Sequence, residues 1–589
     1  MNEQANTEAP AERRWGSDVV AETIRALGYR HVALVPGASF RGLHDSLVNH
    51  LGNHDPAMIV CLHEEHAVAI ADGFSRVAQE PMAVILHSNV GLMHATMTIF
   101  NAWCDRRPML IIGATGPVDA HRRRPWIDWI HTSRDQGALV RPYTKWDDQP
   151  ASAEAAVESL LRADQIARTA PMGPVYVCLD AEMQETELDR HVHVPDVARF
   201  RSPRPAAAPA EDLQRVLEVL RGARAPVLLI GRVSRDTCDW DRRIALAEAL
   251  GATVLTTTHN APGFPTEHPL HGLAPAGERP NEAEIALLMA ADAIVSLDWH
   301  DLAGFLSARC GASQTQVPLA TPIIHCSLDG HVTNGWSMDH QAVAAVDVRI
   351  AADPDRFVGQ LLEAVTTSGD WTASTPIIAS AEHWTVAAPT GPDRAAIFNS
   401  EQLAFTVAAF AEGRDVTFAR LSFGWPRSAC RFRTPLDFLG KDGGGAVGTG
   451  PGHTIGAAIA LRHSGRMTIG VIGDGDYLMG VNALWTASRD RVPLMLIVAN
   501  NRSYFNDEVH QERMARARSR PVENKWIGQR LDDPPPDIIG LARAQGFEGG
   551  RPVRSVDELL AELERGAAVV AAGGRYIIDA LIVPGYSDK

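Results

Sequence analysis

Short runs of consecutive apolar residues recur along the chain and alternate with stretches of helical periodicity. In the first third of the sequence these runs are 31–35, 83–86, 109–112 and 175–179. Runs this apolar are typical of parallel strands that are covered on both faces. Helical patterns over 67–77 and 151–169 lie between them. Strands and helices that alternate in this way predict an α/β unit with a parallel sheet, which we place at 15–188.

Two further units of the same kind follow. A Pro- and Ala-rich segment, 201–210, separates the first unit from a second, which we place at 205–366. Its expected strands are 226–230, 253–257, 293–297 and 323–326. A third unit, which we place at 390–589, has expected strands at 416–419, 467–472, 494–499 and 576–582. The sequence therefore predicts three consecutive α/β domains with parallel sheets.

Composition excludes several classes of protein. The chain has 589 residues, of which 45% are hydrophobic and 21% charged, as in ordinary globular proteins. A net charge of −16 argues against general nucleic-acid binding, which needs a basic face. No apolar run is long enough for a membrane span, and the polar start of the chain does not resemble a signal peptide. The seven cysteines include no CxxC pair, so we expect neither a disulfide framework nor a zinc site, and we expect a cytoplasmic location.

The most informative motif is Gly473-Asp474-Gly475, followed at a distance by Asn500-Asn501. Each part directly follows an expected strand, so parallel pairing would bring Asp474 and Asn501 to the same edge of the sheet. A carboxylate and an amide oxygen are suitable ligands for Mg²⁺, which keeps its other positions for phosphate oxygens and water. Glycines before a helix let backbone amides approach a diphosphate. The alternative is two unrelated turns at strand ends.

Two other segments contribute to this interpretation. The first is the run 63–74, in which Glu64 and Glu65 begin a helical pattern. Acidic residues are common in a first helical turn, and that ordinary explanation is the one we favour for Glu65. The second is the glycine-rich run 443–448, which comes before the strand that leads into Gly473.

Together these motifs resemble the thiamine diphosphate-dependent 2-oxo-acid decarboxylases and carboligases. The resemblance covers nearly the whole chain, and 483–487 looks most like the benzoylformate decarboxylase branch. It implies a pyrimidine-binding, a middle and a diphosphate-binding domain, and it implies thiamine diphosphate and Mg²⁺ as cofactors. The implied metal ligands are Asp474, Asn501 and the backbone carbonyl of Ser503. The implied cofactor-binding residues around them are Gly473, Gly475, Asp476, Tyr504 and Phe505.

The resemblance also assigns catalytic and pocket residues. Glu64 is the residue expected to bind the aminopyrimidine ring of the cofactor. Val447 would be the apolar wedge between its two rings, and the Gly445 carbonyl would meet its amino group. His87 and His131 are candidates for proton transfer, although a histidine at a strand end is more often a packed polar residue. Further expected contacts to the cofactor are Pro36, Gly37, Leu421 and Ser422.

Some positions depart from the family pattern. Ala38 stands where benzoylformate decarboxylase has a serine, and Asp476 stands where relatives often have Ser or Ala. Arg420 occupies a position that is usually neutral or acidic. The loop 231–235 after the first strand of the middle unit shows no strong flavin feature, so FAD is not expected.

The resemblance favours a 2-oxo-acid decarboxylase that can also join its product to an aldehyde or ketone acceptor. It implies a homodimer at minimum, in which Glu64 of one subunit and Asp474 with Asn501 of the other share one cofactor. Homotetramers are common in the family. One alternative is an acetolactate synthase-like carboligase, although 86–91 lacks the Gly-Pro-Gly of that branch. An alternative of another class is a non-catalytic relative that binds the cofactor.

Overall fold

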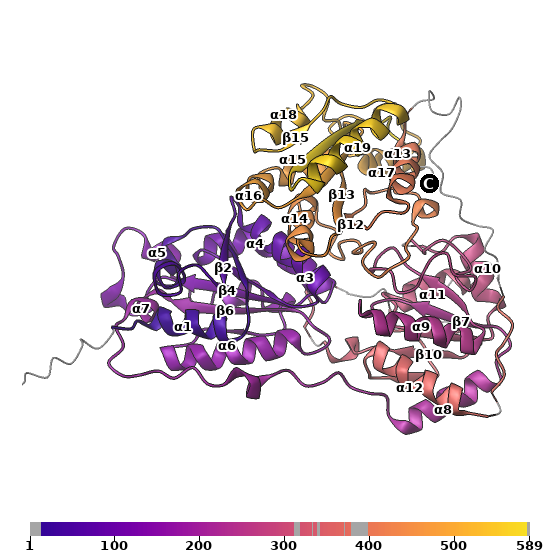
Figure 1. Ribbon diagram of the computed structural model, residues 1–589, viewed down its shortest axis with the longest axis horizontal. Helices are drawn as coiled ribbons and strands as arrows, with labels where there is room; N and C mark the ends of the chain where they lie inside the picture. Colours follow the sequence, from indigo (N-terminus) through magenta and orange to yellow (C-terminus); the bar gives the residue numbers. More distant parts are fainter. Residues whose placement is uncertain are drawn as a thin grey trace, which may run out of the picture.

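The computed structural model describes residues 13–277, 279–310, 319–332, 334–337, 342–369, 371–377 and 398–585. Within them the chain forms three α/β units, each built around a parallel sheet (Figure 1). The predicted fold class is confirmed. The polar segment 1–12 and the expected start of the third unit at 390 lie outside the described residues.

The first unit contains a six-stranded sheet in the order β2-β1-β3-β4-β6-β5. Its strands are β1 (His31–Leu34), β2 (Ala57–Val60), β3 (Met82–Ile85), β4 (Met109–Thr115), β5 (Asp147–Asp148) and β6 (Pro174–Asp180). Its helices are α1 (Gly16–Ala26), α2 (Arg41–Asp45), α3 (Glu64–Ala78), α4 (Ser88–Cys104), α5 (Asp128–His131), α6 (Ala153–Arg168) and α7 (Ala181–Glu185). The central strands are buried along their whole length, which explains their apolar sequences.

The second unit contains a five-stranded sheet in the order β11-β10-β9-β7-β8. Its strands are β7 (Pro226–Ile230), β8 (Thr253–Thr256), β9 (Ala293–Leu297), β10 (Ile323–Cys326) and β11 (Val348–Ile350). Its helices are α8 (Ala210–Arg221), α9 (Thr237–Leu250), α10 (Glu282–Ala290), α11 (Leu302–Cys310) and α12 (Pro354–Thr367). The chain passes from β7 outward to β8 and then returns to β9 on the other side of β7, so the strand order reverses between β7 and β9.

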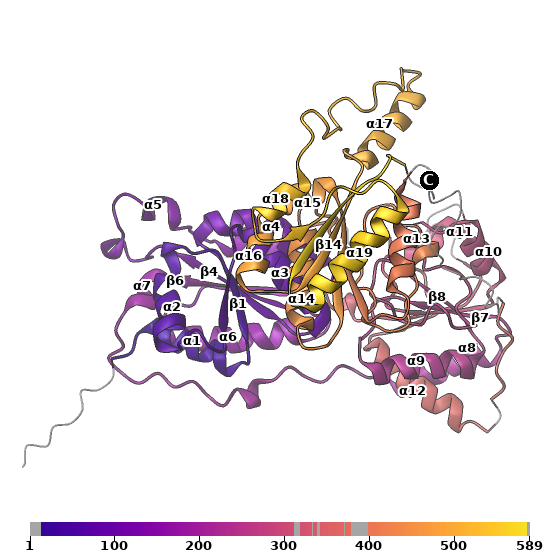
Figure 2. The ribbon, with the colours of Figure 1, turned by 45° about the horizontal axis from the view of Figure 1, so that its top comes forward.

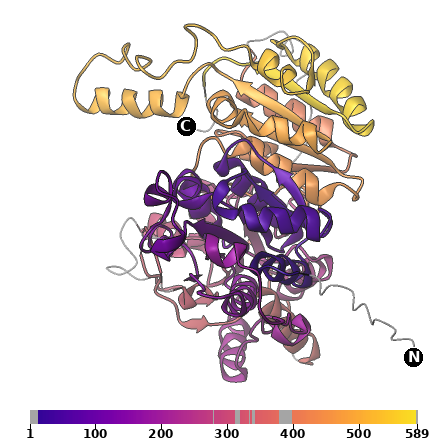
Figure 3. The ribbon, with the colours of Figure 1, turned by 90° about the vertical axis from the view of Figure 1, so that its left-hand side faces the viewer.

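The third unit contains a five-stranded sheet in the order β12-β13-β14-β16-β15. Its strands are β12 (Val416–Arg420), β13 (Met467–Gly473), β14 (Leu494–Asn500), β15 (Glu548–Gly549) and β16 (Arg575–Leu581). Its helices are α13 (Ser400–Ala411), α14 (Gly450–Leu461), α15 (Asp474–Gly480), α16 (Ala483–Arg489), α17 (Phe505–Ala517), α18 (Ile538–Arg543) and α19 (Val556–Ala571). α17 and the segment after it extend away from the body of this unit (Figures 2 and 3).

The first and third units pack closely through α3 and α14 (Figure 1). Glycine permits the approach: a Cβ on Gly73 would lie 2.1 Å from the carbonyl oxygen of His453, and one on Gly456 would lie 1.9 Å from that of Ile70. Buried apolar side chains of both units form one continuous core. No helix in the described part of the chain has the length and apolar character needed to cross a membrane.

Candidate functional site

The Asp474 carboxylate lies at the carboxyl edge of the third sheet, where β13 and β14 are neighbours. Its Oδ1 accepts a hydrogen bond from the Gly475 amide (2.9 Å), and its Oδ2 accepts one from the Ser503 amide (3.2 Å). The same Ser503 amide donates to Asn501 Oδ1 (2.9 Å). The three residues expected to bind a metal ion therefore converge, as parallel pairing of these two strands requires.

The electrostatics of Asp474 favour a bound cation. The residue is 3% exposed, and burial raises its pKa to about 6 although backbone amides act in the opposite direction. Within the described residues no cationic side chain pairs with it. A buried carboxylate without a cationic partner, close to an amide oxygen, fits a hard divalent ion such as Mg²⁺.

The glycine-rich run lies beside this site. Gly445 and Gly448 have φ values of +70° and +102°, which side chains other than glycine rarely adopt. The intervening Val447 is 44% exposed, so its side chain is free to contact a ligand. The carboxylate of Asp476 accepts hydrogen bonds from the amides of Gly448 (2.7 Å) and Gly450 (3.1 Å). Asp476 thus holds the loop against α15.

The remaining expected cofactor contacts surround the same edge. Leu421 and Ser422 are largely buried just beyond β12. The Tyr504 ring packs over Gly475, where a Cβ would come within 2.5 Å of it. Gly473 ends β13 with open space beside it, and Phe505 begins α17.

Glu64 begins α3 on the first unit, and its side chain is nearly buried. The Glu64 Oε2 lies 3.0 Å from Nδ1 of His94, a residue of α4 that stacks on His63 with 4.9 Å between ring centroids. Gly91 leaves room for this carboxylate, because a Cβ there would lie 3.2 Å from Oε1. Glu65 lies on a different side of α3, where burial and then Asp476 raise its pKa.

His87 and His131 contact each other edge to face, with 4.8 Å between ring centroids. The Ser39 hydroxyl lies 2.9 Å from His87 Nδ1, and Gly37 packs directly on the His87 side chain. Burial and then repulsion from His131 lower the pKa of His87, so the ring is neutral at neutral pH. Pro36 is exposed at the start of this loop. The two histidines therefore form one polar cluster with Ser39.

A buried charge network joins the first unit to the glycine-rich run. His453 of α14 lies 2.7 Å from Asp72 of α3 and 3.0 Å from Asp442, which directly precedes the glycines. Arg76 pairs with Asp72, Asp105 and Asp442, and Arg420 pairs with Asp442. Against the effect of burial, the carboxylates of Asp442 and Asp72 raise the pKa of His453 to about 9. The imidazole is therefore charged at neutral pH.

Sequence reasoning missed Ser39, His94 and the charge network. Ser39 is adjacent to Ala38, where a serine was sought, so this departure from the family pattern still leaves a hydroxyl beside His87. A signal for His94 was present, because it lies one turn beyond Gly91 on the helix that follows His87. The network joins residues more than 350 positions apart, and local patterns carry no such information.

Two family models match the chain. Residues 14–139 match the model described as thiamine pyrophosphate enzyme, N-terminal TPP binding domain. Residues 422–580 match the model described as thiamine pyrophosphate enzyme, C-terminal TPP binding domain. The first match contains Glu64 and His87, and the second contains Asp474 and Asn501.

Curated relatives agree with these matches. The chain is 28% identical over 463 residues to the benzoylformate decarboxylase of Pseudomonas aeruginosa, covering 76% of this chain and 79% of that one. It is 23% identical to a protein of Methanocaldococcus jannaschii described as a probable acetolactate synthase large subunit, covering 97% and 92%. Among solved structures, the thiamine diphosphate-dependent 4-hydroxybenzoylformate decarboxylase of Rhodococcus jostii RHA1 has a TM-score of 0.75 at 22% identity, covering 98% and 100%. This last likeness shows the fold.

Proposed function

We propose that this protein is a Mg²⁺-dependent 2-oxo-acid decarboxylase of the thiamine diphosphate-dependent family, whose N- and C-terminal cofactor-binding domains both match the chain. The observation that carries the proposal is the convergence of Asp474, Asn501 and Ser503 at one sheet edge. Bound thiamine diphosphate supplies a carbon nucleophile for the substrate carbonyl and accepts the electron pair left when carbon dioxide departs.

The residues of this chain fit that cofactor. Asp474, Asn501 and the Ser503 carbonyl would hold Mg²⁺, and Gly473 with Gly475 lets the diphosphate approach the backbone. Val447 and the exposed Met479 near Gly448 would give the bound cofactor an apolar surface. An environment of low polarity favours decarboxylation, because the charge of the carboxylate is lost during the reaction.

The first unit supplies the groups that hold and move protons. Glu64 would hold a proton against the aminopyrimidine ring, with His94 fixing the orientation of its carboxylate. His87 is neutral at neutral pH and can therefore accept a proton, and Ser39 fixes its ring. His131 lies beside it and can exchange protons with it or with the substrate.

A turnover assay tests the proposal. Purified protein with Mg²⁺ and thiamine diphosphate is offered aliphatic, aromatic and acidic 2-oxo acids, and carbon dioxide and aldehyde are measured. Glu64→Gln should abolish turnover, whereas the matched control Glu65→Gln should retain it. Equal turnover by the Glu64→Gln variant and the wild type would refute the assignment of Glu64.

We further propose that two copies of the chain share each cofactor. Exposed apolar side chains adjoin both halves of the site: Leu62, Met93 and Val90 near Glu64, and Val447 and Met479 near the metal-binding edge. A partner copy would cover both groups, as burial of apolar surface favours. A dimer is then the smallest active assembly, and a homotetramer is our expectation.

Mixed dimers test this sharing. A dimer of one Glu64→Gln chain and one Asp474→Asn chain, isolated with two different tags, has one intact site if each site uses both chains. It should show about half of the wild-type activity, while each parent variant is inactive. An inactive mixed dimer would show that Glu64 and Asp474 act within one chain.

A second candidate function is carboligation of the acetolactate synthase kind, which the similarity along nearly the whole chain favours. Adding aldehyde or ketone acceptors to the turnover assay and analysing the products separates the two activities. We also propose a cytoplasmic location, since the sequence has no CxxC pair and the thiols of Cys61, Cys178 and Cys326 are buried in the cores of their units.

A further inference from the structure

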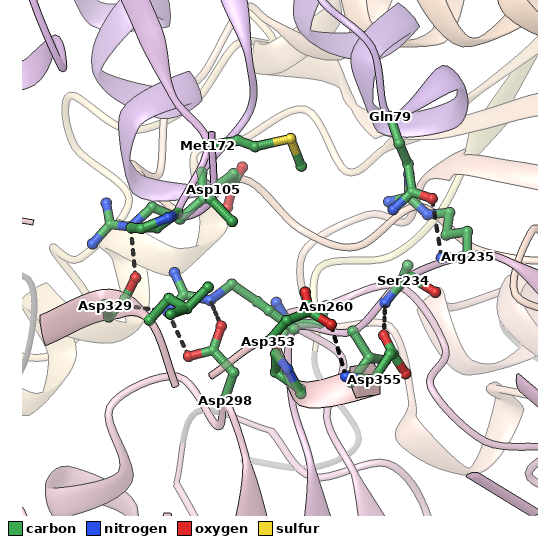
Figure 4. Close-up of a pocket in the computed structure, with 18 of the residues that line it drawn as sticks. Gln79, Asp105, Met172, Ser234, Arg235, Asn260, Asp298, Asp329, Asp353 and Asp355 are labelled. Carbon is green, nitrogen blue, oxygen red and sulfur yellow. Dashed lines mark hydrogen bonds and ion pairs between the residues drawn. The ribbon is translucent and has the colours of Figure 1, made fainter. Parts of the chain in front are cut away.

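A cavity of about 190 Å³ lies between the first and second units, at the carboxyl edge of the middle sheet (Figure 4). Arg232 follows β7 and Asp298 follows β9, so the cavity opens where the strand order reverses. Open α/β sheets bind ligands at such a reversal. The end of α4 closes the cavity from the first unit with Asp105, Arg106 and Arg107.

The carboxylates that line the cavity already have partners. Asp298 pairs with Arg232 (2.9 Å), and Asp329 pairs with Arg106 (2.9 Å) and with Arg232. Asp355 pairs with Arg243. Two others are occupied as well: Asp105 binds Arg76, and Asp353 accepts the first amides of α12. These carboxylates are therefore engaged with other groups.

Two arginines in the same cavity have no such partner. Arg235 is 8% exposed, and its Nε and Nη1 atoms are buried without a hydrogen-bond acceptor. The Nε of Arg107 is likewise buried and unpaired. Among the described residues no carboxylate forms an ion pair with either guanidinium. Unpaired buried donors are costly, and charged ones most of all, so this arrangement calls for an acceptor.

Neighbouring arginines add to the cost of burying the two guanidiniums, and Asp72 and Asp105 offset only part of it. Burial and then repulsion from Arg107 hold the pKa of Arg235 well below its usual range. Burial, followed by repulsion from Arg76, lowers the pKa of Arg107 to about 10. A dianion between the two guanidiniums would replace repulsion by charge-assisted hydrogen bonds.

We propose that Arg107 and Arg235 form a binding site for a small dianion, a phosphate or a dicarboxylate, at the seam between the first and second units. The volume suits a ligand of this size and lies below the roughly 300–1,000 Å³ of pockets for larger ligands. Arg235 also donates its amide to Gln79, the residue that ends α3, so the site touches the helix that carries Glu64 (Figure 4). The proposal is independent of the substrate of the enzyme.

Calorimetric titration of the holoenzyme tests the site. The protein is saturated with thiamine diphosphate and Mg²⁺, so that the diphosphate site is filled, and is titrated with inorganic phosphate or malonate at constant ionic strength. At least one of the two should bind with one site per chain. Arg235→Gln and Arg107→Gln should each weaken it about ten- to a hundredfold, the range expected for charge-assisted hydrogen bonds. The matched control Arg162→Gln, an exposed position on α6, should bind as the wild type does.

Thermal unfolding without the anion provides a second readout. Arg235→Gln removes an unpaired buried charge, so its unfolding midpoint should equal or exceed that of the wild type, and phosphate or malonate should no longer raise it. A midpoint well below that of the wild type in the absence of anion would mean that Arg235 has a structural partner, and would overturn the proposal. So would unchanged affinity in both arginine variants, or no binding of either anion to the wild type.

Discussion

Replacing His453 by glutamine tests the buried link between the first and third units. The wild-type imidazolium lies 2.7 Å from Asp72 and 3.0 Å from Asp442, and it is 2% exposed. The rise of its pKa from 6.5 to about 9 corresponds to about 3 kcal/mol of unfolding free energy, since one pKa step is worth about 1.4 kcal/mol. Glutamine keeps some hydrogen-bonding capacity and loses the charge, so we expect a loss of roughly this size at neutral pH.

The free energy that His453 contributes to folding depends on pH. A base whose pKa is raised on folding contributes its full stability below the unfolded pKa and loses it as the pH rises through the folded value. The wild type should therefore lose its advantage over the variant progressively between about pH 6.5 and about pH 9, the unfolded and folded pKa values of His453.

Differential scanning fluorimetry of both proteins from about pH 6 to about pH 10 measures the gap between their unfolding midpoints. His463→Gln, an exposed histidine beyond the end of α14, is the matched control and should follow the wild type. A gap that stays constant up to pH 10 would refute the reasoning, because it would mean that packing rather than charge carries the effect of His453. A gap close to zero at neutral pH would refute the estimated magnitude.

Three further predictions follow from other contacts. Asp474→Asn should abolish the stabilisation by Mg²⁺ that thermal unfolding measures. In EDTA near pH 8 the variant should have a higher unfolding midpoint than the wild type, because it lacks a buried carboxylate whose pKa is raised to about 6. A lower midpoint in EDTA would contradict this. Gly73→Ala should destabilise the protein by about 1–3 kcal/mol or more, because the new methyl group would clash with the backbone of α14. Gly359→Ala meets open space in α12 and should stabilise the protein by up to about 1 kcal/mol. Thermal unfolding measures both effects. Val447→Ala should weaken thiamine diphosphate binding, measured by calorimetry. Because the side chain is half exposed, the unfolding free energy of the cofactor-free variant should stay within about 0.5 kcal/mol of the wild-type value. A large loss of stability would place the side chain in the core.

The central strands of each sheet could be predicted because helices cover both of their faces. β7, β9 and β10 have the predicted bounds, and their residues are largely apolar. The short edge strands β5 and β15 were not predicted, since two partly exposed residues leave no apolar run. Helix boundaries near Gly480 are set by a turn at Val481 and Asn482, which separates α15 from α16.

The convergence at the third sheet followed from local sequence, because strand ends and parallel pairing determine where Asp474 and Asn501 lie. The surroundings of Glu64 could not be predicted from local sequence, because His94 contacts Glu64 from a different helix. Such contacts depend on how helices pack, which a single sequence does not encode locally. Ser39 illustrates the same limit over a shorter range: its hydroxyl faces His87 only because β1 and β3 are neighbours in the sheet.

Arg420 and Asp476 depart from the family pattern, and their contacts explain how the proposed diphosphate site can tolerate them. Arg420 pairs with Asp442 and lies 3.7 Å from Asp476, so each charge has an opposite one nearby. The Asp476 carboxylate also accepts the amides of Gly448 and Gly450 and is thereby directed at the start of α14. Asp442 also pairs with His453, and His453 pairs with Asp72 of α3. Arg420 and Asp476 therefore belong to the buried charge network that joins the first and third units. Neutralising Arg420 alone would leave Asp476 without this cationic neighbour, so a double replacement of Arg420 and Asp476 should cost less stability than the sum of the two single replacements.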